Sequence, residues 1–197
     1  LDLGRHPAQK NLHGRLQAKI DAAASQVDTI ILGYGLCSMA VIGLKATDCT
    51  LIVPRVDDCI ALFLGSYPAY QEQIAQEPGT YYLTKHWIQI NDSPFAKYER
   101  LAEQYGAQRA ERMVKLMLKN YTRLTFIDTD HQEQAEAKAY ARRAAQRFGL
   151  RYDEIRGSNA LMKKMIHGPW DDDFVVTPPG ETISYTDFKA MTAPRPR

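Results

Sequence analysis

Cysteine is scarce in this sequence, and neither sign of charge is in marked excess. Three cysteines in 197 residues form too small and too odd a set for a disulfide framework, so we expect a reducing, cytoplasmic compartment. The 25 lysines and arginines and the 23 aspartates and glutamates leave a formal net charge of only +2. A dedicated nucleic-acid-binding protein normally carries a strong basic excess, so we expect no nucleic-acid partner.

Long apolar runs are absent as well. One of the longest, Ile60–Leu64, is far shorter than the roughly 20 residues that a membrane-spanning helix needs. The first residues, Leu1 to His6, lack the basic and then apolar order of a secretory signal peptide. We therefore expect no membrane partner. Because Leu1 to Gly4 looks like the end of a strand, we also expect the natural protein to continue upstream.

Strand-like and helix-like segments alternate along the chain. Leu12, Leu16 and Ile20 recur at helical spacing, and short runs rich in β-branched residues predict strands. The predicted strands are 28–32, 50–53, 79–84, 124–127, 150–155 and 174–177. The predicted helices, caps included, are 12–24, 57–64, 68–75, 93–105, 107–119, 130–148, 158–167 and 185–191.

This alternation indicates βαβ units and predicts an α/β fold. We expect a three-layer sandwich, in which one mainly parallel, Rossmann-like sheet carries helices on both faces. We find no internal repeat and no linker, so residues 1–191 are predicted to form a single domain, with a loose C-terminal tail over 192–197. Met113, Leu116 and Met117 are expected on one side of the helix over 107–119.

The residues that follow each predicted strand are the candidates for function, because ligands of open α/β sheets bind beyond the carboxyl ends of the strands. Arg5-His6 follows the partial first strand, residues 33–38 follow the next strand, and residues 54–59 follow the one after that. Two of the three cysteines, Cys37 and Cys59, therefore fall at one edge of the predicted sheet.

Both of these cysteines lie at or just before a predicted helix N-terminus, where the helix dipole and the backbone N–H groups favour a thiolate. His6, Cys37 and Cys59 would make a metal site, suited to zinc with an open position or to an iron–sulfur cluster completed from elsewhere. The alternative is that both cysteines are small buried residues, since their spacing is long. Cys49, at the opposite edge, is interpreted as a structural thiol.

Gly33 and Gly35 are the candidate cofactor-binding residues, because a tight glycine turn lets the backbone approach a ligand or a metal. They do not complete a dinucleotide fingerprint. Ser38 stands at the third glycine position, and the next strand ends in Pro54-Arg55 where an acidic residue would be needed. We therefore expect no NAD, and no pyridoxal phosphate either. A plain strand-to-helix turn is the alternative.

Arg55 and Asp58 are candidate catalytic residues together with Cys59, because they could orient a ligand or support the thiol. The alternative is that Asp57 or Asp58 only caps a helix.

Asp128 and His131 could form an acid–base pair. A helix cap at Asp130 beside a solvated His131 explains the same residues.

Several of these motifs, taken together, resemble the domain-of-unknown-function family numbered 1638. They are Leu32-Gly33-Tyr34-Gly35-Leu36-Cys37, Pro54-Arg55-Val56-Asp57-Asp58-Cys59-Ile60, Phe63-Leu64-Gly65-Ser66, Gly79-Thr80-Tyr81-Tyr82-Leu83-Thr84, Ile127-Asp128-Thr129 and Pro178-Pro179-Gly180-Glu181-Thr182. The resemblance covers nearly the whole chain. It implies one more strand at the start, carrying another cysteine, and a His-x-x-Pro-like turn near His6-Pro7.

The resemblance also implies a link to corrinoid-dependent methyl transfer and one-carbon metabolism, and it supports a metal at the cysteine-bearing edge. Two positions depart from the family pattern. Ser38-Met39-Ala40-Val41-Ile42 stands where a loop containing Gly or Asn is expected. Asp57 stands where His is common, which puts a role for position 57 in doubt.

Three functions are compatible with these residues. The first is a metal-binding protein that holds zinc or an iron–sulfur centre and binds a small-molecule substrate. The second is a metal-free enzyme in which Cys59 is the nucleophile and His6 or His131 the base. The third is a non-catalytic module that binds a small molecule or a partner in the same cleft. A homo-oligomer is compatible with each of them.

Overall fold

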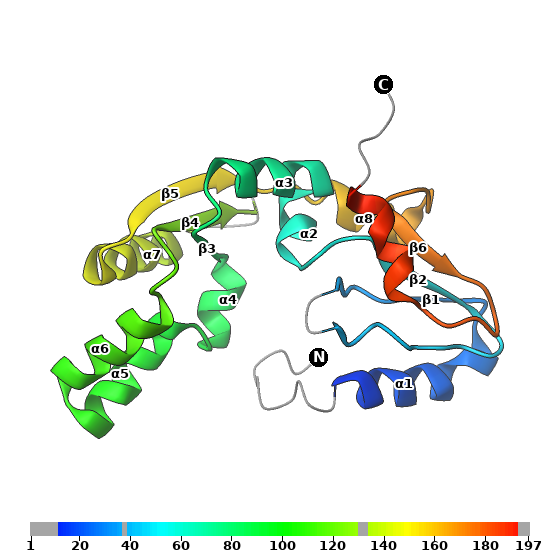
Figure 1. Ribbon diagram of the computed structural model, residues 1–197, viewed down its shortest axis with the longest axis horizontal. Coiled ribbons are helices and arrows are strands. Elements are labelled where there is room, and N and C mark those ends of the chain that lie inside the picture. Colours follow the sequence, from blue (N-terminus) through cyan, green and yellow to red (C-terminus); the bar gives the residue numbers. More distant parts are fainter. Residues whose placement is uncertain (1–11, 37–38, 130–133, 193–197) are drawn as a thin grey trace. The chain divides into compact units, whose positions relative to one another are not determined.

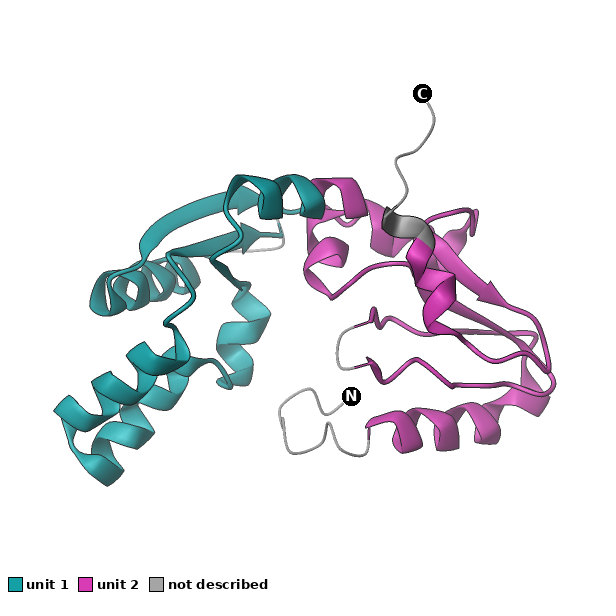
Figure 2. Cartoon of the chain, in the orientation of Figure 1, with its two compact units in different colours: residues 1–5, 70–157 teal, residues 6–69, 158–197 magenta. Residues whose placement is uncertain are grey.

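The computed structural model of the protein describes residues 12–36, 39–129 and 134–192 (Figure 1). The chain divides into two compact units (Figure 2). Of the described residues, 70–129 and 134–157 belong to unit 1, and 12–36, 39–69 and 158–192 belong to unit 2. Unit 1 is thus inserted into the sequence of unit 2. The two units are defined by the contacts within each of them, which is not the same as independent folding. The single domain expected over residues 1–191 therefore stays a prediction.

Unit 2 contains a mixed three-stranded sheet in the order β1-β2-β6. Strands β1 (Thr29–Ile31) and β2 (Thr50–Pro54) are parallel, and β6 (Phe174–Thr177) pairs with β2 in the antiparallel direction. The other elements that begin in this unit are α1 (Leu12–Ala23), η2 (Ala24–Gln26), α2 (Ile60–Leu64), α3 (Tyr67–Gln76), α8 (Ala160–His167) and η4 (Tyr185–Thr192). Helix α3 continues into unit 1.

The core of unit 2 forms between α1 and one face of this sheet. Leu16 and Ile20, one turn apart on α1, are buried, as the helical spacing predicts. They belong to one apolar cluster with Leu51 and Val53 of β2 and with Val175 of β6. Burial of this apolar surface is the main favourable term that holds the unit together.

Unit 1 contains an all-parallel sheet in the order β3-β4-β5. Its elements are β3 (Thr80–Leu83), α4 (Lys85–Ile90), α5 (Pro94–Tyr105), α6 (Ala107–Met117), β4 (Arg123–Asp128), α7 (Ala135–Phe148) and β5 (Arg151–Arg156). The predicted start of α5 is confirmed: the Ser93 hydroxyl accepts a hydrogen bond from the Ala96 N–H at 3.1 Å, and Pro94 follows.

The core of unit 1 joins the sheet to its helices. Leu124 and Phe126 of β4 lie in one buried cluster with Val114 of α6. The side of α6 that carries Leu116 and Met117 is not the side that packs on the core, because Leu116 is 68% exposed and Met117 is 47% exposed. The residues that α6 buries are Ala110 and Val114. Small and β-branched residues therefore make the contact, and the long side chains face outward.

The main correction to the predicted fold concerns its single sheet. The described residues form two three-stranded sheets instead of one, and β6 runs antiparallel to its neighbour. The α/β class is confirmed, but the three-layer sandwich is not. Apolar runs locate the strands, whereas strand partners depend on contacts between distant segments that no local pattern encodes.

Two helix predictions also change. Helix α4 was missed because the predicted strand over 79–84 runs directly into it, although Thr84 caps it by accepting a hydrogen bond from the Trp87 N–H at 3.2 Å. Helix α7 begins at Ala135 and not at the capping-box pattern of 130–133, which lies outside the described residues. None of the helices that the structure describes is both long and apolar enough to span a membrane.

Candidate functional site

The loops after β1 and β2 meet at the carboxyl end of this parallel pair. Ile31 lies opposite Ile52 in the register, and beyond the strands the Leu36 N–H donates to the Val56 carbonyl at 2.9 Å. This hydrogen bond joins the two segments singled out from the sequence. In the sequence, Cys37 directly follows Leu36, and Cys59 comes three residues after Val56.

Gly35 makes this close approach possible. A Cβ atom at position 35 would lie 2.6 Å from the Val56 carbonyl oxygen and 2.8 Å from Val56 Cγ2, distances that side chains do not tolerate. Gly33 differs, because a Cβ atom there would meet only Met165 Cε at 3.7 Å, an ordinary contact. The structure thus gives Gly35 a packing reason to be glycine. A cofactor-binding role for Gly33 and Gly35 stays a prediction.

The segment from Arg55 to Cys59 is held by its own backbone and by one carboxylate. The Arg55 N–H donates to the Asp173 carbonyl at 2.8 Å, which links the end of β2 to the start of β6. Asp58 Oδ1 accepts a hydrogen bond from the Ile60 N–H at 2.8 Å, so Asp58 stabilises the first turn of α2. Cys59, directly before α2, is half-buried.

Arg55 contributes an unusual polar atom to this loop. Its Nε is buried and has no hydrogen-bond partner among the residues that the structure describes. A buried guanidinium nitrogen without an acceptor is costly, and it is the kind of group that a carboxylate or phosphate ligand would satisfy. The catalytic roles predicted for Arg55, Asp58 and Cys59 stay predictions.

Only one of the three predicted metal ligands lies in the described part of the chain. His6 and Cys37 fall outside it, and Cys59 falls within it. Across residues 12–36, 39–129 and 134–192, no three side chains of His, Cys, Asp or Glu gather into a group that could hold a metal ion. The predicted set of His6, Cys37 and Cys59 therefore stays a prediction, because two of its three members lie outside the described residues.

Cys49 behaves as the structural thiol that was expected. It lies before the amino end of β2, is 1% exposed and belongs to the apolar core of unit 2. Burial, and then the neighbouring Asp48 carboxylate, raise the pKa of the Cys49 thiol above its ordinary value. We therefore expect Cys49 to be unreactive in the folded protein and to serve as a reference for the other cysteines.

A polar cluster at the carboxyl ends of β4 and β5 was not anticipated. Lys138 Nζ lies 2.5 Å from Asp128 Oδ2 and 3.0 Å from Glu154 Oε2, and Gln134 donates to Asp128 Oδ1 at 2.8 Å. Asp128 and then Glu154 raise the pKa of Lys138, so its ammonium group keeps its charge. Asp128 therefore has a lysine partner, while His131, its predicted acid–base partner, lies outside the described residues.

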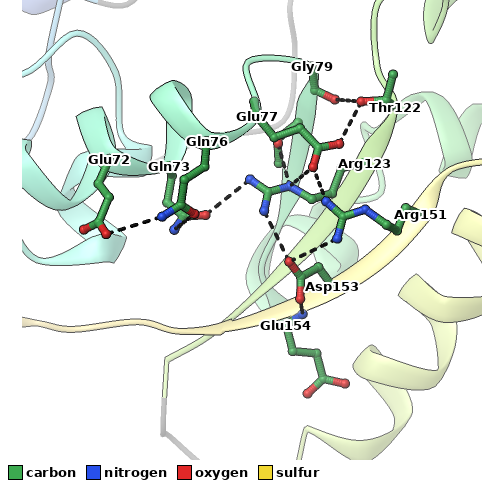
Figure 3. A network of polar contacts seen from close by, with 11 residues as sticks. Glu72, Gln73, Gln76, Glu77, Gly79, Thr122, Arg123, Arg151, Asp153 and Glu154 are labelled. Atoms are coloured by element: carbon green, nitrogen blue, oxygen red, sulfur yellow. Dashed lines mark hydrogen bonds and ion pairs between the residues drawn. The ribbon is translucent and has the colours of Figure 1, made fainter.

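A second unanticipated cluster lies at the amino ends of β3, β4 and β5 (Figure 3). The Arg123 side chain, only 5% exposed, lies at its centre. The guanidinium donates to Thr80 Oγ1 at 2.8 Å, to Asp153 Oδ2 at 3.2 Å and to Gln73 Oε1 at 3.3 Å. Ligands of parallel sheets bind at the opposite end of the strands, so we interpret this cluster as structural.

Glu77 completes the amino-end cluster. Its carboxylate pairs with Arg151 and lies 3.6 Å from Arg123 Nε. A hydrogen bond from the Thr122 hydroxyl, followed by the Arg151 and Arg123 charges, holds the pKa of Glu77 below its ordinary value against an opposing effect of burial. In the sequence, Arg123 comes directly before the predicted strand over 124–127, and no motif marks it.

The fold and the carboxyl ends of β1 and β2 define an α/β protein with a parallel strand pair. The loop after β1, which contains Gly33 and Gly35, meets the loop between β2 and α2, which contains the half-buried Cys59. A model of the family described as a protein of unknown function, DUF1638, matches residues 1–166. The chain belongs to this family. No curated protein and no solved structure matches the chain.

Proposed function

We propose that the carboxyl ends of β1 and β2 carry a metal centre, holding zinc or an iron–sulfur cluster, that binds a small-molecule substrate. The hydrogen bond between the Leu36 N–H and the Val56 carbonyl, 2.9 Å long, is the observation that carries the proposal. It links the segment that precedes Cys37 to the segment that precedes Cys59, which supports two thiolates acting at one site.

The donor chemistry fits such a group. Cys59 is half-buried, as a ligand at the edge of a sheet would be, and thiolate and imidazole donors suit zinc. Cys37 and His6 would complete the set. When bound, zinc would supply Lewis-acid chemistry and a cluster would supply electron transfer.

The chain's own residues supply binding and orientation. Asp58 fixes the first turn of α2 and thereby the backbone beside Cys59. Arg55, with its buried Nε lacking a described acceptor, would bind a carboxylate or phosphate group of the substrate. A small anionic substrate of one-carbon metabolism, as the family resemblance implies, would suit this arrangement.

The test is the metal and acid-labile sulfide content of protein purified without oxygen, together with its absorption spectrum. We expect stoichiometric metal in the parent protein, and its loss in both Cys37→Ala and Cys59→Ala. The matched control is Cys49→Ala, whose thiol lies in the core and should leave the metal in place. Absence of metal from the parent protein, or equal retention in all three variants, would overturn the proposal.

One observation favours a second function. Cys59 is half-buried whereas Cys49 is not accessible, so Cys59 could act as a nucleophile without a metal. This function requires metal-free parent protein, rapid alkylation of Cys59 by iodoacetamide and loss of a screened activity in Cys59→Ser.

A further inference from the structure

A cavity in unit 1, remote in sequence from the cysteine-bearing loops, has the make-up of a ligand site. It has a volume of about 460 Å³ and lies between the first turns of α5 and the second half of α7. Pockets that hold small organic molecules commonly measure about 300–1,000 Å³. All the residues that line it belong to unit 1 and to the described part of the chain.

Three buried aromatic side chains contribute to the lining: Phe95 and Tyr98 of α5 and Phe148 of α7. The centre of the Phe148 ring lies 5.8 Å from the centre of the Phe95 ring and 5.8 Å from that of Tyr98. Ala144 also belongs to the lining. Such a surface favours a planar, apolar ring.

The rim of the cavity carries two positive charges and one negative charge. Arg143 and Arg147 are four residues apart on α7, so they project from the same face of that helix. The Arg147 guanidinium lies over the Tyr98 ring, 3.8 Å from its centre. Within the described ranges, Arg143 has no ion pair or hydrogen bond. Glu99 provides the negative charge.

Tyr140 adds a hydroxyl group to the same cavity. Burial raises the pKa of Tyr140, although a hydrogen bond with Ser93 acts in the opposite direction. The hydroxyl therefore keeps its proton at neutral pH and can donate a hydrogen bond to an anion.

We propose that this cavity binds a small aromatic carboxylate, with its ring against Phe95 and Phe148 and its carboxylate at Arg143, since Arg147 already lies over the Tyr98 ring. A guanidinium without an ion-pair partner provides the charge complementarity, and the aromatic lining provides the apolar contact. The site does not depend on the metal centre proposed above.

The test uses 1-naphthoate as the probe, with binding measured by isothermal titration calorimetry and located by backbone amide shifts in NMR spectra of the whole chain. We expect a dissociation constant on the order of 1 mM or lower for a ligand of this size. The neutral analogue 1-naphthalenemethanol should bind at least about tenfold more weakly, because it cannot form a charge-assisted hydrogen bond.

Three variants distinguish an effect of charge on naphthoate binding from an effect on the folding of the protein. Arg143→Gln removes a positive charge and should weaken naphthoate binding about tenfold. Glu99→Gln removes a negative charge that repels the carboxylate and should strengthen binding about threefold. The matched control is Arg109→Gln: Arg109 lies over the Tyr105 ring at 5.3 Å and does not line the cavity. Binding that is absent, that shifts amides elsewhere, or that changes equally in Arg143→Gln and Arg109→Gln would overturn the proposal.

Discussion

Arg123 is a buried cation at the first position of β4, where an incomplete set of partners would be costly. Its guanidinium is matched by a threonine hydroxyl, a glutamine carbonyl and two carboxylates, which lie on α3, β3 and β5 or just after α3. Arg123 therefore links β4 to β3 and α3, through partners 43 and 50 residues earlier in the sequence, and to β5, through a partner 30 residues later. Because the fork of a guanidinium fits several acceptors at once, a lysine is no equivalent here.

We predict that Arg123→Met lowers the free energy of unfolding by about 3 kcal/mol, because it leaves buried acceptors without their donor. Arg151→Met, in the same cluster but with a side chain that is 57% exposed, should cost less than about 1 kcal/mol. Urea unfolding of the two variants beside the parent protein measures both values. Equal losses of unfolding free energy in the two variants would contradict the prediction that the buried Arg123 contributes more to stability than the exposed Arg151.

Glu77 leads to a prediction about pH. Its pKa in the folded protein is lowered, so its contribution to stability is present above the ordinary value of 4.5 and is lost as the pH falls through the lower folded value. Glu77→Gln should therefore flatten the loss of stability below pH 4.5. Glu72→Gln, a change on exposed α3 surface, is the control and should follow the parent curve. Thermal melts from pH 7 to pH 3 compare them; identical curves for all three proteins would contradict the prediction.

The two described cysteines should differ in reactivity. Cys49 is 1% exposed and its pKa is raised by burial, so iodoacetamide should modify it only after denaturation. Cys59 is half-buried and should react in the folded, metal-depleted protein. Peptide mapping by mass spectrometry distinguishes the two sites, and modification of Cys49 in the native protein would contradict its placement in the core.

At the scale of elements, the close contact between the loops after β1 and β2 depends on Gly35, which has no side chain. Gly35→Ala would place a Cβ atom 2.6 Å from the Val56 carbonyl oxygen, so we predict a loss of about 2 kcal/mol in unfolding free energy. The metal content proposed for this edge should fall as well. Gly33→Ala, with only Met165 Cε at 3.7 Å, is the matched control. If both variants match the parent protein in stability, the close approach is not needed.

Local patterns predicted most elements because they act over a few residues. The Ser93-Pro94 start of α5 and the Gly65 end of α2 are examples: Gly65 has φ 85°, a conformation that favours glycine, and its N–H donates to Ala61. The sheet partners could not be predicted in this way. The antiparallel pairing of Ile52 with Val176 joins segments on either side of unit 1, and nothing in either run specifies the direction of its neighbour.

The candidate site was only partly predictable, for the same reason. The rule that ligands bind at carboxyl strand ends brought the segments 33–36 and 55–59 into consideration, and the hydrogen bond between Leu36 and Val56 confirms that these segments meet. The contacts of the Arg123 side chain depend on four other elements or loops, and no spacing rule collects them. The cavity between α5 and α7 likewise arises from helix packing and not from a motif.

At the scale of the whole molecule, the described residues of unit 1 all lie between positions 70 and 157 and have their own sheet and their own apolar core. We predict that residues 70–157 fold when expressed alone, because every partner of the buried cluster around Leu124 and Phe126 lies within that stretch. Cooperative thermal unfolding and dispersed NMR spectra would support this. Leu124→Asp in the same fragment is the control and should abolish both; an unfolded parent fragment would contradict the prediction.

The insertion of unit 1 also sets an order of events on the ribosome. Strand β2 emerges early, but its antiparallel partner β6, which pairs along Leu51 to Pro54, is translated only after the whole of unit 1. Until then, one edge of an apolar strand lacks its neighbour, the condition under which nascent chains aggregate or engage chaperones. Fast folding of unit 1 would bring the β6 segment close to β2 sooner after its synthesis. The length of the inserted unit thus adds to the time for which this edge of β2 stays unpaired on the ribosome.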